Sequence, residues 1–101
     1  GSSNYIFTGT GYPGTWTDNN TMYLHLGLTY KFINATGSSH PLEFTDNTGN
    51  SPNNGYNDGW ITGSKTGVQY VTIPYNMGGN YIMNYRCTIH GGMGGQIQIV
   101  S

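Results

Sequence analysis

Residues 81–100 read YIMNYRCTIHGGMGGQIQIV. The final part, Gln96–Val100, alternates polar and apolar side chains with a period of two, which is typical of a strand with one buried face. The preceding segment, Tyr81–Thr88, alternates in the same way and contains Cys87, the only cysteine of the chain. Between the two segments lie four glycines, which allow a sharp turn because glycine tolerates positive φ. The stretch therefore predicts two neighbouring strands, with Cys87 pointing into the core.

The rest of the chain continues this pattern of short apolar segments separated by Gly, Asn and Pro clusters. No helical periodicity longer than one turn is present, and threonine and tyrosine are frequent, which favours strands. Predicted strands occupy Asn4–Thr8, Thr21–Leu26, Leu28–Asn34, Leu42–Thr45, Val68–Pro74, Tyr81–Thr88 and Gln96–Val100. Short strands at this spacing predict an all-β fold, a Greek-key β-sandwich or barrel of seven to eight strands. The 101 residues are enough for a single domain, residues 1–101.

Charge is nearly absent from the sequence. Three basic and four acidic residues give a net charge of −1, so we expect neither a nucleic-acid interface nor long-range steering of partners. The many aromatic residues argue against disorder. No apolar run approaches the roughly 20 residues that a membrane-spanning helix needs. We therefore expect a folded monomer without a membrane span, and we interpret Gly1-Ser2-Ser3 as an expression scar.

The residues around the glycine-rich turn form a candidate metal site. Cys87, His90 and Met93 follow one another at intervals of three, and a second histidine, His40, lies in the first half of the chain. One thiolate, two imidazoles and one thioether are the ligand set of a type 1 copper site, in which Met is a weak axial ligand. Zinc rarely uses methionine, and a structural zinc site would need four Cys or His ligands. We predict one copper ion bound by these four residues; a metal-free fold and another metal, including zinc, stay open as alternatives.

His40 must reach the turn from a distant part of the chain. His40, Leu42 and Phe44 are spaced two residues apart, so in a strand their side chains would lie on the same face. We therefore expect His40 to begin a strand whose inner side is apolar. The intervening Glu43 is expected to face out. A sandwich can place the start of this strand beside the turn, which would gather the four ligands at one end of the fold.

The run Cys-x-x-His-x-x-Met between the two final strands resembles the ligand loop of the cupredoxins, the small blue copper proteins. Cys87, His90 and Met93 match the Cys, the second His and the axial Met of that family, and His40 matches its first His. The short spacing is similar to an amicyanin-like ligand loop, and the resemblance covers residues 5–100. It implies an extracytoplasmic protein, periplasmic or extracellular, that carries one electron through Cu(I)/Cu(II) and meets a redox partner near His90.

Catalysis is not expected. The chain has a single cysteine and three histidines, too few for a binuclear copper centre or a multicopper oxidase. The alternative is a copper-binding or structural cupredoxin-like module of a larger extracellular or virion protein, which low charge and a high content of Asn, Gly and Thr would suit.

Other residues receive secondary roles. We expect His25 to be structural or on the surface, Met22 and Met83 to pack in the core, and Met77 to be the rival for the axial position. Tyr75 and Tyr85 are candidates for lining the site, with plain core or surface aromatics as the alternative for each. Asp46–Gly59 is interpreted as an irregular surface crossover. Asn19-Asn20-Thr21 and Asn34-Ala35-Thr36 match the glycosylation acceptor pattern, which we attribute to chance in a chain rich in Asn and Thr.

Overall fold

The computed structural model describes residues 5–9, 12–17, 21–46, 59–77 and 81–101. Within these ranges the chain forms nine strands and two single turns of 3₁₀-helix. The elements are β1 (Ile6–Gly9), β2 (Tyr12–Thr17), β3 (Met22–His25), β4 (Thr29–Ile33), η1 (Gly37–Ser39), β5 (Leu42–Thr45), β6 (Ile61–Gly63), β7 (Val68–Thr72), η2 (Tyr75–Met77), β8 (Ile82–Cys87) and β9 (Gly94–Val100). In the described part of the chain, no helix has the length and apolar character needed to cross a bilayer.

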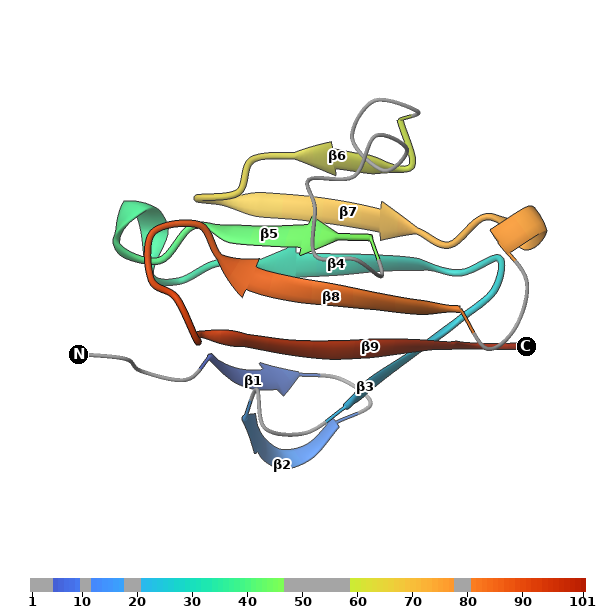
Figure 1. The fold of residues 1–101 in the computed structure, drawn as a ribbon, viewed down its shortest axis with the longest axis horizontal. Helices are drawn as coiled ribbons and strands as arrows, with labels where there is room; N and C mark the ends of the chain where they lie inside the picture. Colours follow the sequence, from blue (N-terminus) through green and yellow to red (C-terminus); the bar gives the residue numbers. More distant parts are fainter. Residues whose placement is uncertain (1–4, 10–11, 18–20, 47–58, 78–80) are drawn as a thin grey trace.

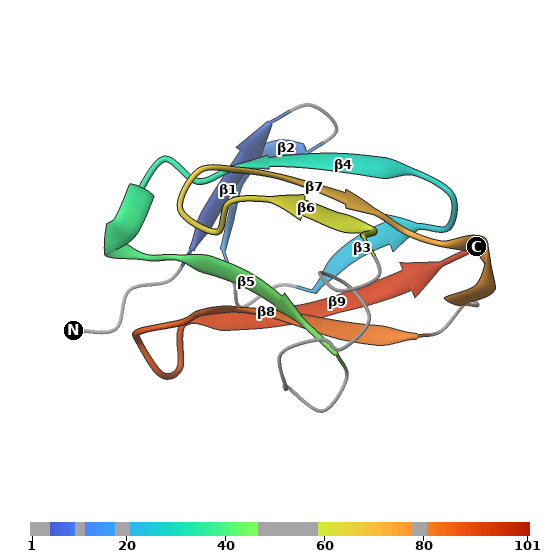
Figure 2. The same ribbon diagram turned by 90° about the horizontal axis from the view of Figure 1, so that it is seen from above.

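The strands form two main sheets that face each other, as Figure 2 shows from above. One sheet has the order β3-β9-β8-β5 and the other the order β4-β7-β6, while β1 and β2 pair as a separate hairpin. All pairs are antiparallel except β3 with β9. The all-β sandwich that the sequence predicts is thereby confirmed, and its Greek-key connectivity stays a prediction.

Two strands add to the seven predicted from the sequence. One is β2, which contains Pro13 and Gly14, residues that normally mark turns. The other is β6, whose three residues are too few to show alternation. The region Asp46–Gly59, interpreted above as a crossover, lies outside the described residues except at its two ends.

The core lies between the two main sheets, and the side chains that enter it alternate along the strands as predicted. From the four-stranded sheet it takes Met83, Tyr85 and Cys87 of β8 and Ile97 and Ile99 of β9, all buried. Leu42 and Phe44 of β5 stand opposite Cys87 and Tyr85 in the register between β5 and β8. Each such apolar side chain removed from water contributes roughly 1.5–3 kcal/mol. This packing fixes β5 and β8 side by side, and the ends of these strands carry the candidate ligands.

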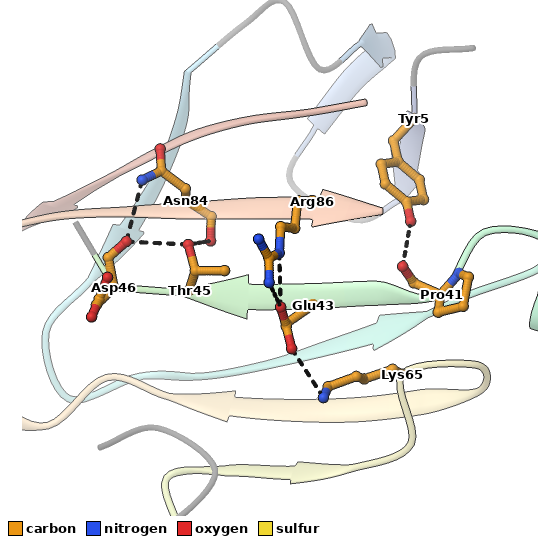
Figure 3. Close-up of polar contacts among 8 residues, drawn as sticks. All are labelled: Tyr5, Pro41, Glu43, Thr45, Asp46, Lys65, Asn84 and Arg86. Atoms are coloured by element: carbon orange, nitrogen blue, oxygen red, sulfur yellow. Dashed lines mark hydrogen bonds and ion pairs between the residues drawn. The ribbon is translucent and has the colours of Figure 1, made fainter. Parts of the chain in front are cut away.

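Glu43 differs from its expected exposure. Its side chain does point away from Leu42 and Phe44, but it is covered, and the residue is only 4% exposed. Arg86, its cross-strand neighbour, donates to Oε1 from Nε (2.8 Å) and from Nη2 (2.7 Å), and Lys65 Nζ lies 3.1 Å from Oε2 (Figure 3). Burial by itself raises the pKa of the Glu43 carboxyl, yet the hydrogen bonds and charges of Lys65 and Arg86 outweigh burial and hold this pKa below its usual value.

Candidate metal centre

Cys87 is the last residue of β8 and is buried, at 4% exposure. Its backbone N–H donates a 2.8 Å hydrogen bond to the carbonyl oxygen of Met93. This bond closes the segment 87–93 into a compact loop at the end of the sandwich where β8 ends and β9 begins (Figure 1). The sheet thus holds the thiol rigidly, because its backbone is paired with Leu42 on one side and closed by the loop on the other.

Glycines let the loop turn back onto the sheet. Gly92 has φ +80°, and Gly94 has φ +156° opposite Arg86 in the β8–β9 register. A Cβ atom on Gly94 would collide with the carbonyl oxygen of Tyr85. The close approach at Gly94 therefore requires glycine for two reasons, the backbone angle and the space.

His40 comes from the connection between β4 and β5, directly after η1. Here β5 begins at Leu42, two residues beyond His40, so the ligand precedes the strand and does not begin it. The N–H of Thr88 donates to the carbonyl oxygen of Pro41 (3.2 Å), which ties the His40 segment to the ligand loop. The two segments are therefore adjacent although about fifty residues separate them.

Three heteroatoms meet at this point. The Nδ1 atoms of His40 and His90 lie 3.1 Å apart, and Cys87 Sγ lies 3.8 Å from the first and 3.4 Å from the second. An atom in their plane and equidistant from all three would stand about 2.0 Å from each, against about 2.0–2.1 Å for metal–nitrogen and about 2.3 Å for metal–sulfur distances in protein zinc sites. The three side chains therefore fit a metal ion of this size with only a small outward shift of the sulfur.

Two imidazole nitrogens and a thiol are donor atoms that metal sites use, and the same three atoms are also close enough to share hydrogen bonds. A neutral imidazole carries its single N–H on Nδ1 or on Nε2, so the tautomers of His40 and His90 decide which atom donates in each contact. Comparisons of this chain with protein-family models, with characterised proteins and with solved structures find no match. The site is therefore interpreted from its own geometry: His40, Cys87 and His90, with Met93 beside them, can bind a metal ion.

Met93, the predicted fourth ligand, lies in the same region of the fold as the three donor atoms. Its side chain is buried, at 3% exposure, in the same core cluster as Cys87, and it lines one cavity together with His40. The rival Met77 lies on η2, at the opposite end of the sandwich in both views (Figures 1 and 2). Met22 and Met83 are core residues of β3 and β8, as predicted.

His25 is an exposed residue at the end of β3, so its assignment to the surface is confirmed. Tyr85 is buried in the core on β8, two residues before Cys87. For Tyr75 the alternative of a surface aromatic is the one observed: it is 81% exposed on η2, where its ring occupies the space beside Gly27, and η2 lies at the other end of the sandwich from the ligand loop (Figure 1).

Two residues that form hydrogen bonds to the backbone carbonyl of His40 were not predicted from the sequence. The Tyr5 hydroxyl lies 2.9 Å from the carbonyl oxygen of Pro41 (Figure 3) and 2.9 Å from that of His40. The Tyr5 ring meets the His40 imidazole edge-on, with 6.5 Å between the ring centroids. The side chain of Asn34 also binds the His40 carbonyl. Neither could be found by spacing, because Tyr5 is 35 residues away in sequence and Asn34 lies in a glycosylation-like pattern.

Proposed function

We propose that the protein binds one copper ion through His40 Nδ1, Cys87 Sγ and His90 Nδ1, with the Met93 thioether as a weak fourth ligand. The observation that supports this proposal most strongly is the close approach of these three atoms, which lie 3.1, 3.4 and 3.8 Å from one another. A thiolate with two imidazoles and a thioether favours copper over zinc, because two His and one Cys with a weak Met are the ligands of blue-copper sites, whereas zinc sites use Cys, His, Asp and Glu. This is the site expected from the resemblance to cupredoxins.

We further propose that the protein transfers electrons and is not an enzyme. Bound copper would supply the reversible Cu(I)/Cu(II) couple. The chain contributes ligands that are already held near their bonding positions, since Cys87 is fixed in a paired strand and His40 is tied to the ligand loop through Pro41. Burial of Cys87 and Met93 keeps bulk water away from the sulfur ligands. Such preorganisation suits a carrier, whose site must change little between two charge states.

His90 is the proposed point of contact with a redox partner. Its side chain is half-buried, while the neighbouring Ile89 is 59% exposed and Gly91 and Gly92 lie at the surface. A small, uncharged surface of this kind favours weak and transient docking. An extracytoplasmic location, periplasmic or extracellular, is part of the proposal and rests on the family resemblance alone.

Voltammetry of the copper-loaded protein tests the electron-transfer proposal. We expect a reversible one-electron wave with closely spaced peaks, and its loss in the protein loaded with redox-inert zinc. A copper-loaded protein without a reversible wave would show that the site binds metal for a structural purpose, as expected of a structural module.

A further inference from the structure

The connection that carries His40 is held at both of its ends by one short turn. This connection, residues 34–42, leaves β4 and enters β5, and the turn Ser64–Gly67 links β6 to β7. The carbonyl oxygen of Lys65 accepts from the Leu42 N–H (2.8 Å) and from Asn34 Nδ2 (3.0 Å), and that of Gly67 accepts from the Asn34 N–H (2.9 Å). The two ends of the connection are thereby held together.

The Asn34 side chain extends this support to the ligand itself. Its Nδ2 donates to the His40 carbonyl oxygen at 2.7 Å as well as to Lys65. Its Oδ1 accepts from the Thr36 N–H (3.0 Å) and lies 2.6 Å from Thr36 Oγ1. Both amide hydrogens and both oxygen lone pairs are thus in use, and the carbonyls around Nδ2 fix which way the amide points.

We infer that Asn34 is a positioning residue for His40: it fixes the peptide group of the ligand, and through it the imidazole, before any metal binds. The role rests on the proposed metal site. Holding the backbone on either side of the η1 turn limits the directions that the His40 side chain can take, so less ordering is left for metal binding. Because Nδ2 is engaged with two carbonyls, the Asn34-Ala35-Thr36 pattern serves this support and not glycosylation.

Replacement of Asn34 by leucine isolates this role. Asn34→Leu keeps the approximate shape and charge of the side chain but removes its hydrogen bonds. The fold is expected to persist, because the His40 carbonyl keeps Tyr5 as a donor and the Lys65 carbonyl keeps Leu42. The matched control is Asn76→Leu, since Asn76 is exposed on η2 at the opposite end of the molecule.

The experiment measures copper affinity by competition with a chelator, the energy of the visible thiolate–copper band, and the imidazole NMR signals of the metal-free protein. For Asn34→Leu we expect affinity to fall by about 10–100-fold, as is usual when a group that orients a ligand is lost. We also expect a shifted band and an exchange-broadened His40 signal without metal. Asn76→Leu should match the wild type in all three readouts.

A second pair of variants keeps the test decisive if Asn34→Leu does not fold. Thr36→Val removes the hydroxyl that lies 2.6 Å from Asn34 Oδ1 and 3.2 Å from the His40 carbonyl oxygen, whereas Thr36→Ser retains it, so this pair tests the support that Asn34 and Thr36 give together. Thr36→Val should weaken copper binding and Thr36→Ser should restore it. Wild-type affinity, band and imidazole signals in Asn34→Leu, or in Thr36→Val, would overturn the positioning role while leaving copper binding intact. If the wild type itself binds no copper, the proposed function fails, and the metal-free imidazole signals still decide the role of Asn34.

Discussion

His40 and His90, separated by 50 positions in the sequence, bring their Nδ1 atoms to 3.1 Å from each other, and the Cys87 sulfur lies within 3.8 Å of both. Each imidazole comes from a different segment, one before β5 and one after β8. Pairing of β5 with β8 is therefore what assembles the candidate site, and the core residues behind it set the ligand spacing.

Removal of His40 should abolish tight copper binding. His40→Ala takes away one corner of the ligand triangle, so we expect a loss of affinity larger than the about 10–100-fold that is typical of groups that only orient a ligand. His25→Ala is the control, because His25 is exposed on β3 and outside the site. Competition with a chelator measures both variants. Equal affinities in the two would remove His40 from the ligand set.

Met93→Leu should separate the metal-tuning role of Met93 from its packing. The two side chains have similar volume, so we expect the unfolding free energy to fall by less than about 1.5 kcal/mol. The reduction potential should rise, because loss of the thioether donor disfavours Cu(II) more than Cu(I). Met77→Leu, at the other end of the sandwich, should leave the potential unchanged. An unchanged potential in Met93→Leu would mean that this sulfur does not act on the metal.

Glu43 should make stability depend on pH. Its pKa is lower in the folded protein than the unfolded value of about 4.3. The ionised carboxylate therefore stabilises the fold fully above that unfolded value, and this contribution is lost as pH falls through the lower pKa of the folded state. Glu43→Gln should cost roughly 1.5–3 kcal/mol at neutral pH, the range for hydrogen bonds to charged groups.

Urea unfolding between neutral pH and acid measures this effect. The stability difference between wild type and Glu43→Gln should shrink as the pH falls below the unfolded pKa. A difference that stays constant across this range would show that the ion pairs with Lys65 and Arg86 do not stabilise the fold.

Gly94 and Gly91 should respond differently to alanine. Gly94→Ala places a Cβ against the Tyr85 carbonyl in a backbone conformation that L-residues rarely adopt, so we expect a loss of at least about 2 kcal/mol. A Cβ at Gly91 meets nothing within 4 Å, and Gly91→Ala should change stability by no more than about 0.5 kcal/mol. Thermal unfolding compares them, and equal melting temperatures would contradict the close approach of β9 to β8 at Gly94.

The sequence was sufficient for the parts of the site that depend on local spacing. Alternation along β8 correctly predicted that Cys87 is buried with Met83 and Tyr85. The three-residue intervals brought His90 and Met93 into the same loop. His40 could be assigned because the chain has only three histidines and because His40 alternates in step with the apolar residues Leu42 and Phe44.

Features that depend on contacts between distant segments could not be predicted. From its place in the alternation Glu43 is predicted to face solvent. Its burial is explained only by the folded structure, in which Lys65 approaches it from the β6–β7 turn. Tyr5 and Asn34 carry no signal for their contacts with the His40 carbonyl, because these contacts require the folded arrangement of β1 and β4 around the ligand segment.

Addition of Cu(II) to the metal-free protein, followed by visible absorption, tests the central claim most directly. We expect an intense thiolate–copper charge-transfer band that saturates at one copper per chain and is absent in Cys87→Ser. A colourless titration with Cys87 reduced, or a band that persists in Cys87→Ser, would contradict a copper site built on this cysteine.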